Sequence, residues 1–306
     1  MGRDNEPVSV EARSFLLAGY LVPDKRTVMQ PIKTILFPTD FSETAQNAIR
    51  YCLWLADQWG ASVELLHVVF PEYDALDLPV MATKATQEKV EAARAVLQTF
   101  VDHALVQVQT GYAFHRTPDV RPDVEVGSPA AVIAQVARRD QADMIVMGTR
   151  GEHNLLEHLF GSVTTGVIEK AHCHVWVVPE EAGFESINIV VYGADLSEAD
   201  PYHIWKVGQW LEPFGAVLHC VHIQAGADTG HELRIQDLES FFRDHAPSLQ
   251  IRFHKYAGKS VTGALDEFAG HYDADLLVMY APYHSLLDQI VQTSSTRKKT
   301  MQTPMH

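Results

Sequence analysis

Three glycines and a serine lie close together in the segment MGTRGEHNLLEHLFGS. Gly148 ends an apolar run, Gly151 follows three residues later, and Gly161 directly precedes Ser162. Glycine lets the backbone approach a ligand closely or adopt a positive φ, and the N–H groups at the start of a helix attract phosphate. The spacing therefore indicates either a phosphate-binding loop or, without any ligand, a strand end, a turn and a helix cap.

A carboxylate lies at the end of another apolar run. Asp40 follows ILFPT and precedes a segment with apolar residues at helical spacing. At that place it could accept a hydrogen bond from a sugar hydroxyl or from the amino group of a base. Alternatively, it caps the following helix together with Ser42. The strand end therefore fits either a ligand contact or a local cap.

The elements that must position these residues occur twice. Two long segments match at an offset of 155 residues, which aligns Asp40 with Asp195. A later match aligns Asp143 with Asp275 at an offset of 132, so the second copy is about 23 residues shorter. In each copy, short apolar runs alternate with helical patterns. This alternation predicts an α/β fold with an open, parallel, Rossmann-like sheet in each of two tandem domains.

The predicted organisation is a tail over residues 1–30, a first domain over 31–179, a linker over 180–186 and a second domain over 187–306. In open sheets of this kind, ligands bind outside the carboxyl ends of the strands, near the point where the strand order reverses. Asp40 and the glycine segment both fall at such ends. We therefore expect them to belong to one site.

Composition excludes several classes of function. The chain has 306 residues, is 46% hydrophobic and carries a formal charge of −15. This balance argues against a general binder of nucleic acid or of anionic membranes, which needs a basic face. No apolar run reaches the length of a membrane span. Cys52, Cys173 and Cys220 lie in apolar surroundings without paired spacing, which favours buried thiols in a reducing, cytoplasmic compartment.

The motifs of the first copy together resemble those of the universal stress protein family. They are ILFPTDFSETA, LLHVV, VEVGSPAAVIAQVA and ADMIVMGTRG, and residues 148–162 match the family's nucleotide motif of G-x-x-G, nine residues, then G followed by Ser or Thr. The resemblance implies bound ATP, with or without Mg²⁺. It places adenine and ribose near the first two strand ends and the triphosphate in the glycine segment. Carried over residue by residue, it implies contacts from Pro38, Thr39, Asp40, Val68, Met147, Gly148, Gly151, Gly161, Ser162 and Val163.

The second copy departs from this pattern. Aligned on Met279, the positions of the three glycines hold Tyr280, Tyr283 and Thr293. Two tyrosine rings would fill the phosphate space, and Pro282 offers no N–H. The second copy is therefore expected not to bind ATP.

The second copy is also expected to lack its fifth strand, because Met305 and His306 align with Cys173 and His174. The last strand of the first copy, HVWVVP, would then lie at an unpaired edge, and such edges invite pairing. We expect Val175–Val178 to pair with the same strand of a second chain in a homodimer. The alternative is that RSFLLAGYLVP of the tail covers this edge.

Enzymatic turnover would need an activating group, such as a general base or a lysine at the γ-phosphate. The glycine segment contains no GK[ST] element, and Glu157 and His158 would diverge on a helix. The HCH segment at 172–174 is interpreted as a surface position rather than a metal site. The sequence favours an ATP-binding stress-response regulator that is not an enzyme and acts on an unidentified protein partner. A slow adenine-nucleotide hydrolase or transferase, and a scaffold with a structural nucleotide, are the alternatives.

Overall fold

The structure is a computed structural model that describes residues 14–17, 20–23, 32–71, 79–149, 161–180, 182–183, 186–197, 200–224, 230–279 and 300–303. The first half contains β3 (Thr34–Thr39), α1 (Glu43–Trp59), β4 (Ser62–Val69), α2 (Pro79–Gln109), β5 (Val120–Val126), α3 (Pro129–Arg139), β6 (Met144–Gly148), α4 (Ser162–Lys170) and β7 (His174–Val178). The second half contains β8 (Ile189–Ala194), α5 (Asp200–Leu211), the 3₁₀ helix η1 (Glu212–Phe214), β9 (Val217–Gln224), α6 (Gly230–His245), β10 (Ile251–Ala257), α7 (Val261–His271), β11 (Leu276–Met279) and β12 (Thr300–Thr303).

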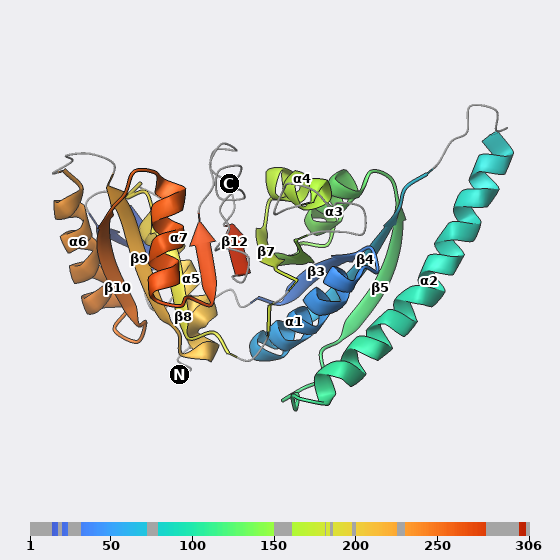
Figure 1. Ribbon diagram of the computed structural model, residues 1–306, viewed down its shortest axis with the longest axis horizontal. Coiled ribbons are helices and arrows are strands. Elements are labelled where there is room, and N and C mark those ends of the chain that lie inside the picture. Colours follow the sequence, from blue (N-terminus) through green and yellow to red (C-terminus); the bar gives the residue numbers. More distant parts are fainter. Residues whose placement is uncertain are drawn as a thin grey trace, which may run out of the picture.

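All strands from β3 onward belong to one ten-stranded sheet in the order β10-β9-β8-β11-β12-β7-β6-β3-β4-β5 (Figure 1). The strands are parallel within each half, and α1, α2, α5 and α6 pack on one face while α3, α4 and α7 pack on the other. Because both faces are covered, strands such as ILF at 35–37 are apolar at successive positions. The predicted α/β fold with two tandem Rossmann-like halves is confirmed.

The expectation that the second half has no fifth strand needs a correction. β12 lies beside β11, parallel to it, at the place that β7 takes beside β6. The sequence alignment missed it because the connection is shorter in the second half. Met144 pairs with His174, 30 positions later, whereas Leu276 pairs with Thr300, only 24 positions later. An alignment at the constant offset of 132 therefore placed the expected strand too late in the chain and did not recognise Thr300–Thr303 as a strand.

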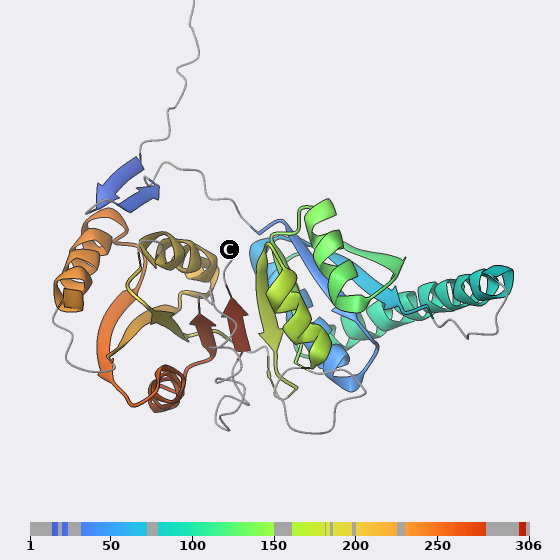
Figure 2. The same ribbon diagram turned by 90° about the horizontal axis from the view of Figure 1, so that it is seen from above.

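The edge of β7 is not open to a second chain. β12 pairs with it in antiparallel fashion, with Met301 opposite Val177 and Thr303 opposite Val175. The premise of the expected homodimer is therefore wrong, and so is the alternative in which the tail covers this edge. Part of the tail, Ser14–Leu17 (β1) and Tyr20–Pro23 (β2), instead forms an antiparallel pair of strands that packs against α5 of the second half (Figure 2).

Aromatic side chains fill the junction between the halves. The indole Nε1 of Trp59 on α1 donates to the carbonyl oxygen of Trp210 on α5 at 3.0 Å. The ring of Trp59 packs edge-on against Trp176 of β7, and His174 packs edge-on against Trp210. His174 is only 3% exposed, so its predicted surface position is wrong. The three cysteines are buried as predicted, and burial raises the pKa of the Cys173 thiol to about 12.

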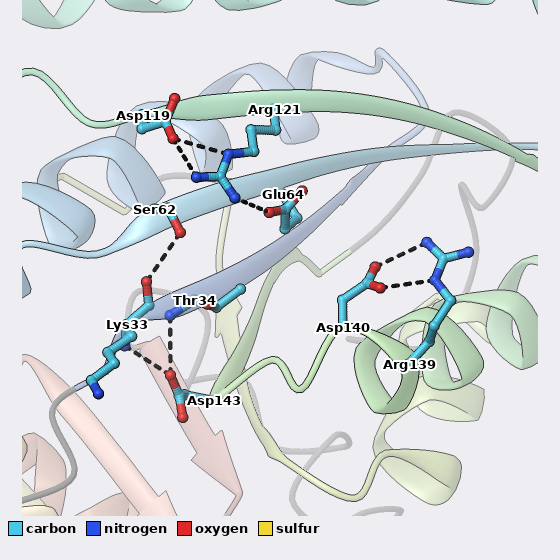
Figure 3. A network of polar contacts seen from close by, with 9 residues as sticks. All are labelled: Lys33, Thr34, Ser62, Glu64, Asp119, Arg121, Arg139, Asp140 and Asp143. Carbon is cyan, nitrogen blue, oxygen red and sulfur yellow. Dashed lines mark hydrogen bonds and ion pairs between the residues drawn. The ribbon is translucent and has the colours of Figure 1, made fainter.

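A carboxylate fixes the amino end of the first strand in each half. The Asp143 carboxylate accepts hydrogen bonds from the backbone N–H groups of Lys33 and Thr34 at 2.8 and 3.0 Å (Figure 3). Asp275 accepts the equivalent pair of bonds in the second half, from residues 188 and 189, at 2.7 and 3.0 Å. In each half, these hydrogen bonds tie the start of the first strand to the residue just before the neighbouring strand, and so fix the two strands relative to each other.

The outer edge strand β5 carries charges and a proline. The Arg121 guanidinium bonds the Asp119 carboxylate at 2.7 and 2.9 Å and reaches Glu64 of β4 at 3.2 Å (Figure 3). Pro122, the next residue, has no N–H to offer a further strand. The exposed edge of the first half is therefore poorly suited to pairing with another chain.

The β7–β12 pairing predicts how truncation will act. Removal of residues 300–306 uncovers the edge of β7, and we expect the shortened chain to associate and to unfold at a lower temperature, because unpaired edges pair with other strands. Light scattering and thermal melting measure both effects. Removal of residues 304–306 alone is the matched control. Two monomeric variants of equal stability would show that this pairing does not hold the halves together.

Candidate functional site

A cavity of about 390 Å³ lies at the carboxyl ends of the strands in the first half. It opens where the strand order reverses, since β4 lies on one side of β3 and β6 lies on the other. Side chains and backbone from β3, β4, β6, α1, α3 and α4 line it. The site is therefore at the place that the alternating pattern predicts for a ligand.

The turn after β3 forms one wall. One oxygen of the Asp40 carboxylate accepts hydrogen bonds from the backbone N–H and the hydroxyl of Ser42, at 3.1 and 2.6 Å. Ser42 in turn accepts from the N–H of Ala45 and caps α1. Asp40 thus supports the cap, while its exposed carboxylate also lines the cavity. The two roles considered for Asp40 are compatible.

A second feature of this turn could not be read from the sequence. Phe41 has a φ of 67°, which is strained for a side chain of this size. Its N–H donates to the Thr39 hydroxyl at 3.0 Å, and its ring stacks on His67 with the centroids 4.6 Å apart. His67 donates through Nδ1 to the Thr39 carbonyl oxygen at 2.8 Å, because a carbonyl only accepts. These contacts hold the wall in a fixed shape.

The start of α4 forms the opposite wall. Gly161 is the N-cap residue and has no side chain that could bond the first N–H groups of the helix. The N–H of Gly161 donates to the Thr149 carbonyl oxygen at 2.7 Å. The Thr164 hydroxyl donates to the Gly148 carbonyl oxygen at 3.1 Å. The helix start is therefore tied to the end of β6, and within the described residues no side chain caps it. Such a helix end attracts an anion.

The described glycines of this segment do not serve a positive φ. Gly161 has φ −66° and ψ 159°, which any residue adopts. Gly148 is a strand residue, and an added Cβ would lie 2.9 Å from the side-chain methyl of Thr44. Gly148 therefore lets α1 approach β6, whereas Gly161 lines the cavity at the start of α4.

The remaining wall is apolar. Leu66 and Phe70 come from β4 and the residue that follows it, and Pro129 and Ile133 come from α3. None of these four residues is among the ten site residues expected from the sequence. An apolar residue directly after a strand end was the available signal for Phe70, but the contribution of α3 depends on how that helix packs on β4.

The structure brings nine of the ten predicted site residues to this cavity: Pro38, Thr39, Asp40, Val68, Met147, Gly148, Gly161, Ser162 and Val163. Gly151 lies outside the described residues, as do the loop residues at 150–158 and the two tyrosines expected to block the second site, Tyr280 and Tyr283. The described part of the chain contains no group of three or more His, Cys, Asp or Glu placed to hold a metal ion. None of the described helices is both long and apolar enough to cross a membrane.

The second half differs at the corresponding place. Asp200, at the start of α5, is 1% exposed and accepts hydrogen bonds from the Tyr192 hydroxyl at 2.8 Å and from the Leu196 N–H at 2.6 Å. Burial, with the Asp195 carboxylate nearby, raises the pKa of Asp200 to about 7. The buried carboxyl therefore fixes the turn after β8, where Leu196 has a φ of 58°.

This raised pKa predicts a pH-dependent stability. The unfolded chain releases the Asp200 proton near the ordinary pKa of 3.8, whereas the folded chain keeps it up to about pH 7. The free energy of unfolding should therefore fall between pH 4 and 7, by about 1.4 kcal/mol for each unit of pKa difference as an upper limit. Asp200→Asn should remove this part of the fall, because an amide can replace a neutral carboxyl here.

Denaturant unfolding at several pH values measures the difference between the variant and the unchanged chain. Asp244→Asn, an exposed position on α6, is the control and should follow the unchanged chain. If the curves of Asp200→Asn and the unchanged chain run parallel from pH 4 to 7, Asp200 is already ionised in the folded state.

The chain is similar to proteins of a known family. Residues 31–179 match the model of the Universal stress protein family. Universal stress proteins MJ0577 and MJ0531 of Methanocaldococcus jannaschii are each 31% identical to this chain, over 157 and 146 residues. Each alignment covers 48% of this chain, with 94% of MJ0577 and 81% of MJ0531.

A solved structure extends the likeness to both halves. The crystal structure of a universal stress protein from Archaeoglobus fulgidus superposes with a TM-score of 0.67, covering 90% of this chain and 99% of that one at 15% identity. The TM-score shows a common fold over the 90% of this chain that is covered. The chain belongs to the universal stress protein family.

Proposed function

We propose that the first half binds ATP and that the protein acts as a nucleotide-dependent regulator of a stress response. The observation that carries this proposal is the cavity itself, which joins an apolar wall to a helix start that no described side chain caps. An aromatic base fits the first, and phosphate oxygens fit the second. Asp40, between them, is placed to accept a hydrogen bond from a ribose hydroxyl. Any Mg²⁺ would be bound by the phosphates of the nucleotide, since the described residues offer no metal-binding cluster.

We further propose that the nucleotide is a signal rather than a substrate. Among the described lining residues, Asp40 and His67 are the titratable ones. Asp40 supports a helix cap, and the Nδ1 of His67 is occupied by a backbone carbonyl. This supports binding without rapid turnover, because phosphoryl transfer needs a positioned base and cations at the phosphates. An unidentified protein partner in the cytoplasm would read the bound state.

Substitution at Gly161 tests the site. Gly161→Val should reduce ATP affinity below detection, because the side chain would occupy the wall beside the helix start. The fold should be unaffected, since β-branched residues accept the φ and ψ of this position. Calorimetric titration measures affinity, and circular dichroism measures the fold.

Gly111→Val is the matched control, because an added Cβ there meets no atom within 4 Å and Gly111 does not line the cavity. It should bind ATP as the unchanged chain does. Full ATP affinity in Gly161→Val would exclude this wall as the phosphate site.

The binding stoichiometry tests the difference between the halves. Only the first half carries the glycine pattern, while the second has tyrosines and a proline at the matching positions of the sequence. We therefore expect one ATP per chain at saturation in calorimetry. A measured value of two would mean that the second half also binds the triphosphate.

A further inference from the structure

Phe70 is the most exposed large apolar residue at the cavity. It follows β4 directly, lines the cavity and is 59% exposed. Leaving an aromatic ring in water forgoes the free energy that its burial would provide. Exposed apolar residues are common when they are scattered singly, but this ring lies at the mouth of the site.

The direction of Phe70 follows from the alternation of β4. Leu66 and Val68 face α3 and α4, whereas Leu65 and Val69 face α1 and α2. Side chains alternate along a strand, so the next position of the first row is that of Phe70. The ring therefore continues the apolar row of β4 beyond the end of the strand, on the side where the cavity lies.

The surroundings of Phe70 suit a flat, apolar group. Pro129 and Ile133 of α3 belong to the same wall, and α3 packs on β4. The anion-binding end of the cavity is formed by other elements, at the start of α4. A ligand with its phosphates at α4 would thus place its other end among Phe70, Val68 and the first turn of α3.

From this placement we infer that Phe70 is the stacking platform for the aromatic base of the bound nucleotide. The inference rests on the proposed function. It adds a residue that would strengthen nucleotide binding through contact with the base and not with the phosphates. Stacking of a base on an aromatic ring is strong and tolerant of base identity, because every base has a π face. Phe70 therefore sets how tightly a base is held and leaves base identity to other contacts.

The test measures three probes on the full chain: ATP, adenosine and inorganic tripolyphosphate. Phe70→Ala should weaken ATP and adenosine by a similar factor, about five- to a hundredfold. Tripolyphosphate should bind unchanged, because it has no base. Phe70→Trp should restore both affinities. Val106→Ala on α2 is the control, since Val106 is 61% exposed but does not line the cavity.

Phe70→Trp also supplies a direct signal. The five native tryptophans lie at the junction elements and not in the cavity lining: Trp54, Trp59, Trp176, Trp205 and Trp210. Adenosine should therefore quench the additional fluorescence of Phe70→Trp, while the fluorescence of the unchanged chain stays constant.

The outcomes distinguish a failure of the stacking role from a failure of the proposed nucleotide binding. Unchanged adenosine affinity in Phe70→Ala, or an equal loss of tripolyphosphate affinity, would overturn the stacking role while ATP binding by the unchanged chain stands. Binding of none of the three probes by the unchanged chain would overturn both the stacking role and the proposed function. Circular dichroism of each variant confirms that the exposed substitution leaves the fold intact.

Discussion

The antiparallel pairing of β7 with β12 is the contact on which the architecture depends. Each half has an open parallel sheet that ends at this point, and an open sheet leaves the N–H and C=O groups of its last strand unpaired. Three register pairs join the two edges, and Val175, Trp176 and Val177 of β7 become almost fully buried. The helices α1 and α5 can then meet through Trp59 and Trp210 on one face. One ladder thus joins two sheets into one, with an apolar core on each face that extends through both halves.

Much of the fold could be predicted because its repeat is visible in residues that have a fixed structural task. Asp143 and Asp275, found at a common offset, turned out to hold the starts of the two sheets. β12 could not be predicted in the same way. Its sequence, TMQT, has no long apolar run, and its place depends on the length of the connection before it. Pairing with β7 supplies the stabilisation that the strand's own composition lacks.

In the candidate site, too, some residues could be predicted from local sequence and others depend on tertiary packing. Residues within a motif, such as Asp40 and Ser162, lie where the motif implies because local turns and a helix start place them. Ile133 joins the site only through the packing of α3, which no local pattern encodes. A residue of the motif can also have a packing role that the sequence did not indicate. Gly148 lines the cavity and also makes room for the Thr44 methyl, so a packing requirement accompanies the expected ligand contact at this glycine.

The central ladder leaves β5 and β10 as the two ends of the sheet. These ends are different surfaces, so a contact from one copy's β5 to another copy's β10 would not close on itself. It would add molecules indefinitely and grow a filament. Pro122 and the ion pairs of Arg121 place a barrier at one of the two ends, and one barrier is enough, since every such contact needs both. The proline and the ion pairs of β5 therefore disfavour growth of the ten-stranded sheet from one copy to the next.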